Sequence, residues 1–152
     1  MKPTQRYLLG LCAILTLSFS ACKKTFDKKT TRITYGYSFG MANSVQKIQL
    51  HADLFTFEQK SAAFKLDKRC SQSADEATFK NILNTLDDAG FSKLPETYGC
   101  PDCADGGAEF IEIENDGKVQ RVTYDYNKAP KELTEAAAKL KLVMASFEDC
   151  KP

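Results

Sequence analysis

The chain has 152 residues, with 21 lysines and arginines, 20 aspartates and glutamates and a single histidine. This near balance of charge argues against nucleic acid as a partner, because nucleic-acid-binding domains usually carry a clear basic excess. The sequence contains no histidine-rich metal motif and no phosphate-binding loop, which gives hydrolase chemistry little support.

The first 21 residues are typical of a processing signal. Two basic residues precede an apolar run over residues 7–19, which is too short to span a bilayer comfortably. The run leads into Ser20-Ala-Cys22, which resembles the lipobox of bacterial lipoproteins, although Phe19 stands where leucine is the commoner residue. The resemblance implies cleavage before Cys22 and lipidation of that cysteine. An ordinary cleaved signal peptide and an uncleaved anchor are the alternatives.

Residues 22–30 are predicted to be the lipidated cysteine and a polar tether. Cleavage removes two basic residues and no acidic ones, so 19 basic and 20 acidic residues remain. The lysines of the tether either face an anionic membrane surface or belong to a solvated spacer. Lys23 follows the cysteine instead of the aspartate that commonly retains lipoproteins in the inner membrane. The resemblance therefore implies the outer membrane, facing the periplasm.

Three strands are expected in the first part of the folded domain. Apolar and polar residues alternate over residues 33–39 and again over 48–54, as in strands with one buried face. The alternation changes phase after Leu54, which predicts a bulge or bend there. A third, short strand is predicted over residues 62–66.

A helix is expected over residues 74–89. Ser73 and Glu76 have the spacing of a capping box, in which each side chain bonds a backbone N–H of the first turn. Apolar residues then recur at helical spacing, and Gly90 supplies the left-handed residue that ends such helices.

Residues 108–126 have the pattern of a β-hairpin. Asp116-Gly117 is a residue pair favoured by the tight type I′ turn, and a two-residue loop fixes the register of both strands. The predicted pairs are Asn115 with Lys118, Ile113 with Gln120, Glu112 with Arg121, Ile111 with Val122 and Glu109 with Tyr124.

The last element is a helix over residues 130–148, in which Pro130 suits the first position and an apolar stripe includes Leu140. The element order is then β-β-β-α-β-β-α. We expect an α+β domain over residues 31–152: an antiparallel sheet of about five strands with both helices packed on one face.

After cleavage of the leader, which contains Cys12, four cysteines other than the anchor remain and allow three disulfide pairings. Following the chain through the predicted layers brings Cys150 near Cys70 and leaves Cys100 with Cys103. The Cys100-Pro-Asp-Cys103 spacing also occurs in redox motifs, but there the motif opens a helix, and here a strand follows. A four-cysteine zinc site is a further alternative, which an oxidising compartment disfavours.

The loop around these cysteines is the candidate interaction site, with Tyr98, Asp102, Asp105 and Glu109 as its candidate residues. Three carboxylates here could converge on a hard cation, but their spacing matches no EF-hand loop, and carboxylates beside glycines are usually turn residues. We therefore expect no metal. The hairpin register puts Glu109 on the helix-facing side, either at a frayed edge, which is favoured, or bonded to the Tyr124 phenol.

Residues 34–40 (TYGYSFG) and 98–107 (YGCPDCADGG) together resemble a group of small bacterial envelope lipoproteins of unknown function. This resemblance implies no activity. We expect a non-enzymatic binding or interaction domain, with no catalytic residues and no cofactor. Its partners would be the membrane, through the anchor, and an envelope protein or ligand, without nucleic acid. The alternatives are a thiol-disulfide redox protein that uses the 100–103 loop and a periplasmic hydrolase inhibitor.

Overall fold

The computed structural model describes residues 26–40, 42, 44–61, 65–101, 103 and 106–150, which form an α+β fold with a seven-stranded mixed sheet and two α-helices. The leader and Cys22 lie outside the described residues. Within the described ranges no helix is both long and apolar enough to cross a membrane.

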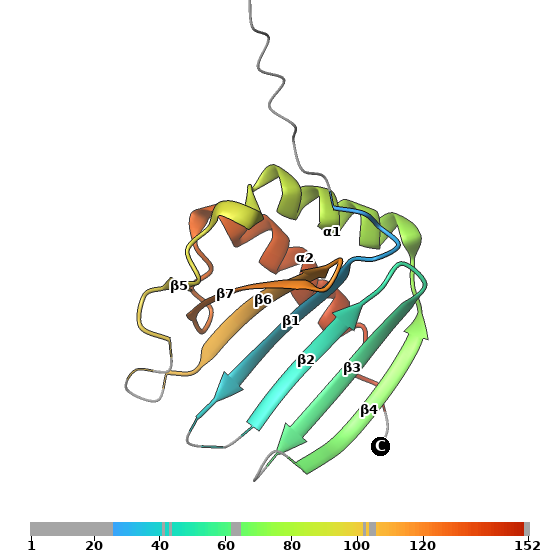
Figure 1. Cartoon of the computed structure of the whole chain (residues 1–152). Helices are drawn as coiled ribbons and strands as arrows, with labels where there is room; N and C mark the ends of the chain where they lie inside the picture. The colour runs from blue at the N-terminus through green and yellow to red at the C-terminus, as the bar shows by residue number, and fades with distance from the viewer. Residues whose placement is uncertain are drawn as a thin grey trace, which may run out of the picture.

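The strands follow the order β4-β3-β2-β1-β6-β7-β5 across the sheet (Figure 1). Their bounds are β1 Arg32–Phe39, β2 Ser44–Leu50, β3 Leu54–Ser61, β4 Lys65–Ser73, β5 Thr97–Tyr98, β6 Ala108–Asn115 and β7 Lys118–Asp125. All neighbours are antiparallel except β5 and β7. β1 lies in the middle of the sheet, and its helix-facing residues Ile33 and Tyr35 are fully buried.

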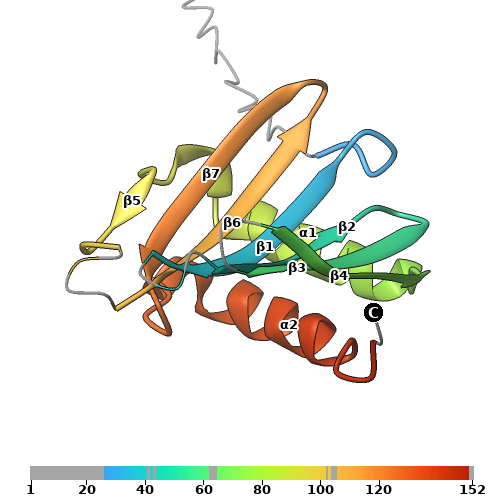
Figure 2. The same ribbon diagram turned by 90° about the horizontal axis from the view of Figure 1, so that it is seen from below.

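Both helices pack on the same face of the sheet (Figure 2). They are α1 (Glu76–Asp88) and α2 (Thr134–Ala145). The short 3-10 turn η1 (Phe91–Lys93) follows α1, and a second one, η3 (Lys131–Leu133), precedes α2. The buried side chains of the two helices join those of five strands in one core. Leu140, in the middle of the α2 stripe, is fully buried, as predicted.

The predicted count of five strands is wrong. Of the predicted bulge or bend near Leu54, the bend is confirmed at residues 52–53, but it separates two strands: the His51 N–H bonds the Leu54 carbonyl and a new strand, β3, begins there. Of the third predicted strand, residues 62–64 are not described and Leu66 belongs to β4. β5 is also additional: its two residues pair in parallel with β7, so the sheet is mixed.

The predicted capping box is also wrong. Ser73 ends β4, and Asp75 is the N-cap of α1 instead. The Asp75 carboxylate accepts hydrogen bonds from the backbone N–H groups of Ala77 and Thr78, both at 3.2 Å. Aspartate serves the cap as well as serine does, so the helix starts later than its sequence signature indicates.

The hairpin of β6 and β7 is confirmed in every predicted pair. Asp116 and Gly117 both have positive φ, as a type I′ turn requires. Arg121 Nη2 lies 2.7 Å from the carboxylate of Glu112 on the outer face, and the Arg121 guanidinium also covers the Phe110 ring at 4.3 Å.

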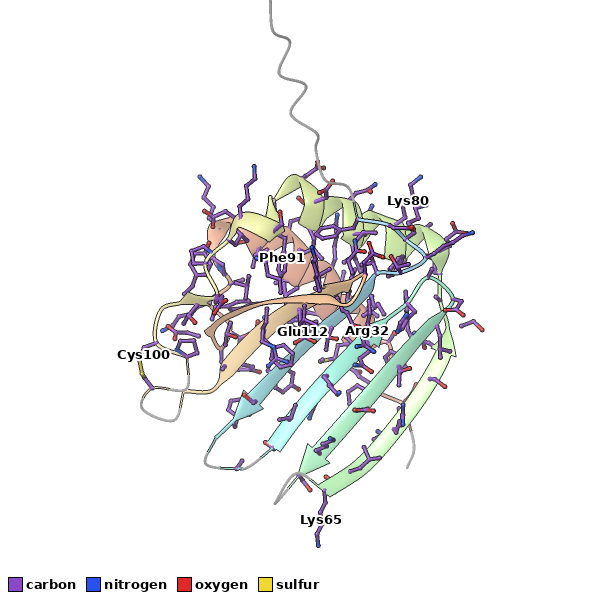
Figure 3. All side chains as sticks on the ribbon, viewed as in Figure 1. Arg32, Lys65, Lys80, Phe91, Cys100 and Glu112 are labelled. Atoms are coloured by element: carbon purple, nitrogen blue, oxygen red, sulfur yellow. A yellow bond between two sulfur atoms is a disulfide. The ribbon has the colours of Figure 1, made fainter. Side chains whose placement is uncertain are left out.

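The outer face of the sheet, which carries no helix, is lined by ion pairs. Arg32 pairs with Glu114, and Lys47 pairs with Glu58 at 3.0 Å. Figure 3 shows Arg32 and Glu112 on the strands of this open face. Charge pairs across strands suit a solvated surface and contribute little each to stability.

Residues 26–31 make a turn against the domain, although the sequence places most of them in the tether. Phe26 packs against the core, and the Thr31 N–H bonds the Asp27 carbonyl at 3.0 Å. Lys28 lies 3.8 Å from Glu76 at the start of α1. The described chain thus meets the sheet at the end where β1 begins.

Candidate functional site

Of the four residues predicted for the interaction loop, the structure describes Tyr98 and Glu109. Asp102 and Asp105 lie outside the described residues, and Tyr98 is half-buried in β5. Glu109 is not a loop residue and not at a frayed edge. It is the second residue of β6 and its side chain is fully buried, which corrects the favoured expectation.

Cys100 and Cys103 are bonded to each other and exposed, on the loop that projects beyond the sheet (Figure 3). The Cys103 N–H bonds the Cys100 carbonyl at 3.0 Å, which closes a turn, and the Cys100 N–H bonds the Asp125 carboxylate at 3.0 Å. The described part of this loop holds no α-helix, so the dipole that activates a redox thiol is not supplied there. The arrangement is that of a loop staple.

Cys70 and Cys150 are likewise bonded, with their Cα atoms 6.0 Å apart. This is the pairing expected from the topology, and it ties the end of the chain to β4. The oxidation state of both pairs in the cell stays a prediction.

The buried Glu109 carboxylate is held by two groups from outside its strand. Lys141 of α2 places its ammonium 3.0 Å from Glu109 Oε1, and the backbone N–H of Asn127 donates to the same oxygen at 3.0 Å. Lys141 also donates to the side-chain oxygen of Asn127 at 2.8 Å. Asn127 has a positive φ, which turns the chain after β7 so that its N–H meets the carboxylate.

Two buried tyrosines flank the same carboxylate. Burial raises the pKa of the Tyr35 phenol strongly, and the negative charge of Glu109 raises it further. The pKa of Tyr124 is raised by burial first, then by the Glu109 charge and by hydrogen bonding to that carboxylate, which was the alternative placement predicted for Glu109. Both shifts favour the protonated phenols in the folded domain.

Three buried oxygens at this place lack a hydrogen bond of regular geometry among the described residues. They are Glu109 Oε2 and the hydroxyls of Tyr35 and Tyr124. A buried polar atom without a partner costs free energy, commonly about 1–3 kcal/mol. Such groups are rare in folded proteins and frequently mark a place where water or a ligand binds.

Glu109 and Tyr35 form part of the floor of a cleft of about 380 Å³ between the sheet and the C-terminal part of α2. We call it the Glu109 cleft. Its lining residues are Tyr35, Tyr37, Gln46, Phe57, Gln59, Lys68, Glu109, Tyr126, Asn127, Lys141, Met144, Ala145, Phe147 and Glu148.

Three aromatic rings pack together at one end of the cleft. Tyr126 lies edge-on to Phe39 at 4.9 Å and to Tyr37 at 5.5 Å between ring centroids. Burial raises the pKa of the Tyr37 phenol, which donates a hydrogen bond to Gln46 Oε1 at 2.6 Å. Gly107 is required beside them, because a Cβ there would lie 2.6 Å from the Phe39 ring.

A larger groove of about 590 Å³ lies between α1 and α2, over Phe55, Ile82 and Val143. Its polar residues, such as Asn81 and Lys139, bond each other or their own helices. No buried unpartnered polar atom of the described chain belongs to this groove. The Glu109 cleft is therefore the stronger candidate site.

No cluster of three or more histidine, cysteine, aspartate or glutamate side chains capable of holding a metal ion occurs among the described residues. Sequence reasoning found Glu109 but missed its partners Tyr35, Tyr37 and Lys141. The signal available was the hairpin register, which puts a carboxylate on the face that otherwise forms the core. Lys141 carries no such signal, because its place depends on how α2 lies on the sheet.

No protein-family model matches this sequence, and no curated protein is significantly similar to it. The case for a function therefore rests on the residues and geometry of the Glu109 cleft.

Proposed function

We propose that this protein is a lipid-anchored, non-enzymatic binding domain of the bacterial cell envelope, and that its ligand occupies the Glu109 cleft. The observation that carries the proposal is Glu109 itself: a fully buried carboxylate in the floor of a cleft, whose second oxygen makes no hydrogen bond of regular geometry among the described residues. Clefts that combine apolar walls with a few converging polar groups are the usual form of small-ligand sites.

Binding without chemistry is favoured by the character of the lining residues. No serine, cysteine or histidine occurs among them, and these are the commonest nucleophiles and bases of enzymes. The one buried carboxylate is already engaged by Lys141 and Asn127 on its other oxygen. The other oxygen of this carboxylate can still accept a hydrogen bond from a ligand.

The anchor is supported by the leader and the position of Cys22. Labelling of the full-length protein with palmitate in a bacterial host tests it. Incorporation into the wild type and none into Cys22→Ser is the expected result. A wild-type protein without label would overturn the lipoprotein assignment.

The binding site is tested with intrinsic tyrosine fluorescence, since the chain has six tyrosines and no tryptophan. The full-length protein in detergent is titrated with separate lipid, peptide and glycan fractions of the envelope. Three tyrosines line the cleft, so one fraction should change the emission in a saturable way.

A matched pair of variants on α2 locates the signal. Ala145 lines the cleft, whereas Ala138 is exposed on the same helix and does not line it. Ala145→Phe should abolish the saturable change and Ala138→Phe should preserve it. No response to any fraction, or equal loss in both variants, would contradict binding in this cleft.

A further inference from the structure

A polar row of side chains crosses the helix-facing side of the sheet. The strand register places its members side by side on six neighbouring strands. They are, from β7 to β4, Tyr124, Glu109, Tyr37, Gln46, Gln59 and Lys68. The adjacent row on the same side contains Val122, Ile111, Tyr35, Ile48, Phe57 and Cys70. The helix-facing side of the sheet thus changes from mainly apolar to polar between two adjacent rows of side chains. The polar row lies near the edge of the sheet where β1 and β3 end.

The row forms one side of the Glu109 cleft, because all its members except Tyr124 are lining residues. Neighbouring strands are about 4.8 Å apart, so the row from Glu109 on β6 to Lys68 on β4 extends over roughly 19 Å. Lys141, Ala145 and Glu148, at and just beyond the C-terminal half of α2, line the cleft from the helix side. A site of this form suits a linear ligand that lies across the strands.

The charges of the cleft balance. Lys68 and Lys141 are its cations, and Glu109 and Glu148 are its anions. Glu109 is already neutralised by Lys141 at 3.0 Å. An anionic ligand would be opposed by Glu148 and a cationic one by Lys68, since like charges brought together disfavour binding. The cleft therefore favours a ligand without net charge.

The polar groups of the row include both donors and acceptors. The Tyr37 hydroxyl donates a hydrogen bond to the side-chain oxygen of Gln46, so the Gln46 amide nitrogen is left to donate to a ligand. The Gln59 amide offers both functions, and Glu109 Oε2 is an acceptor that makes no hydrogen bond of regular geometry among the described residues. Hydroxyl groups serve donors and acceptors alike. The rings of Tyr37 and Tyr126 supply apolar surface for C–H groups at one end.

We propose that the Glu109 cleft binds an uncharged linear oligosaccharide, which lies along the polar row from Glu109 to Lys68. This assignment rests on the proposed function, which makes the cleft the ligand site. The length of one sugar unit in an extended glycan is close to the spacing of neighbouring strands, so successive units would meet successive side chains of the row.

The probe is N,N′,N″-triacetylchitotriose, a neutral linear trisaccharide, titrated into the full-length protein in detergent and followed by tyrosine fluorescence. Saturable binding is expected. Gln59→Leu removes one member of the row and should weaken binding about tenfold, the effect of one or two lost hydrogen bonds. Gln49→Leu makes the same change at a β2 residue that faces away from the helices and should leave binding unchanged.

Ala145→Phe supplies a second variant, from the opposite wall, and should also abolish trisaccharide binding. The proposal is overturned if neither chitotriose nor cellotriose binds, or if the two leucine variants bind the trisaccharide equally. It is also overturned if the cationic, de-acetylated trisaccharide binds as tightly as the neutral one. A peptide or lipid fraction that alone gives the signal sensitive to Ala145→Phe would refute the saccharide assignment and leave the proposed function intact.

Discussion

Lys141 on α2 reaches the carboxylate of Glu109 on β6 across the helix–sheet interface, and the two charged atoms are 3.0 Å apart. The Glu109 side chain is 0% exposed, whereas that of Lys141 is 41% exposed. The lysine therefore brings a partly solvent-exposed cation to a fully buried anion, and links the second helix to the floor of the cleft.

Replacing Lys141 with methionine should destabilise the fold by about 3 kcal/mol, because it leaves a buried carboxylate without its countercharge. The additional change Glu109→Gln should recover most of that loss, since the buried charge is then gone. Denaturant unfolding at neutral pH measures both free energies.

Lys139→Met is the control on the same helix. Lys139 pairs with Glu135, whose side chain is 71% exposed, and donates to the uncharged side chains of Asn81 and Thr85 on α1. Its removal leaves no buried charge, so it should cost about 1 kcal/mol and less than Lys141→Met. If Lys141→Met costs no more than Lys139→Met, the Glu109 carboxylate is not a buried charge.

The two phenols that flank Glu109 predict a loss of stability at high pH. Burial and the Glu109 charge raise the pKa of both Tyr35 and Tyr124 in the folded state. Below about pH 10 these groups are protonated in both states. Above it the unfolded chain releases protons that the folded chain retains, so the free energy of unfolding falls as pH rises.

Absorbance at 295 nm measures the ionisation of these phenols. The last part of the tyrosinate signal should appear only when circular dichroism reports unfolding. Tyr35→Phe combined with Tyr124→Phe should remove that last part. A full tyrosinate signal from protein that is still folded would show that both phenols are accessible to base.

Leu140→Ala should destabilise the protein by about 2–5 kcal/mol, as expected for a truncated core residue. Leu142 on the same helix is 73% exposed, and Leu142→Ala should change stability by no more than about 0.5 kcal/mol. Thermal and denaturant unfolding provide both values. A small and equal effect at the two positions would mean that α2 is peripheral to the core.

Gly107→Ala should be more damaging than Gly117→Ala. Both glycines have positive φ, so alanine costs about 1–2 kcal/mol of backbone strain at each. An added Cβ meets nothing within 4 Å at Gly117, but lies 2.6 Å from the Phe39 ring at Gly107. The crowding should add about 1–3 kcal/mol. Equal losses of stability in the two variants would show that the Phe39 ring moves away from an added Cβ at no cost.

Peptide mapping without reductant should find Cys70 joined to Cys150 and Cys100 joined to Cys103. The bond between Cys70 and Cys150 spans 80 residues, and a loop of that length contributes about 4.5 kcal/mol in the chain-entropy model. The bond between Cys100 and Cys103 closes only a short loop, so Cys100→Ser combined with Cys103→Ser should cost about 2 kcal/mol. A fragment that joins Cys70 to Cys100 or Cys103 would contradict this topology.

The elements that sequence analysis predicted well are those fixed by local rules. Asp116 and Gly117 determine the turn, the turn determines the register, and the register puts Glu112 opposite Arg121. The buried position of Leu140 follows from helical periodicity alone. These features depend on neighbours in the sequence, and a single chain contains that information.

The missed strands depend on weaker signals. The turn at residues 51–53 contains neither glycine nor proline, so it looked like a disturbance in one strand. β5 exists because the Thr123 N–H bonds the Glu96 carbonyl and β7 offers a free edge. A two-residue strand of this kind has no pattern of its own and is created by the partner beside it.

The candidate site was predictable only in part, for a related reason. The hairpin register alone places Glu109 opposite Tyr124. Tyr37 reads as an ordinary strand residue and Gln46 lies before the predicted strand of residues 48–54, so neither is marked as a site residue until β1, β2 and β6 are assembled in their actual order. The rotation of α2 then decides that Lys141, and not Lys139, meets the carboxylate.

The direction of β1 has a consequence for how the protein would work in a cell. The strand begins near Phe26, and Tyr37, its sixth residue, lies at the cleft, roughly 17 Å farther along. With the proposed anchor at Cys22, only residues 23–25 separate the lipid from Phe26, a span of at most about 14 Å. The start of β1 would then lie close to the bilayer and the Glu109 cleft would lie at the end of the domain that is farther from it. A polymeric ligand could bind there without contacting the lipid surface.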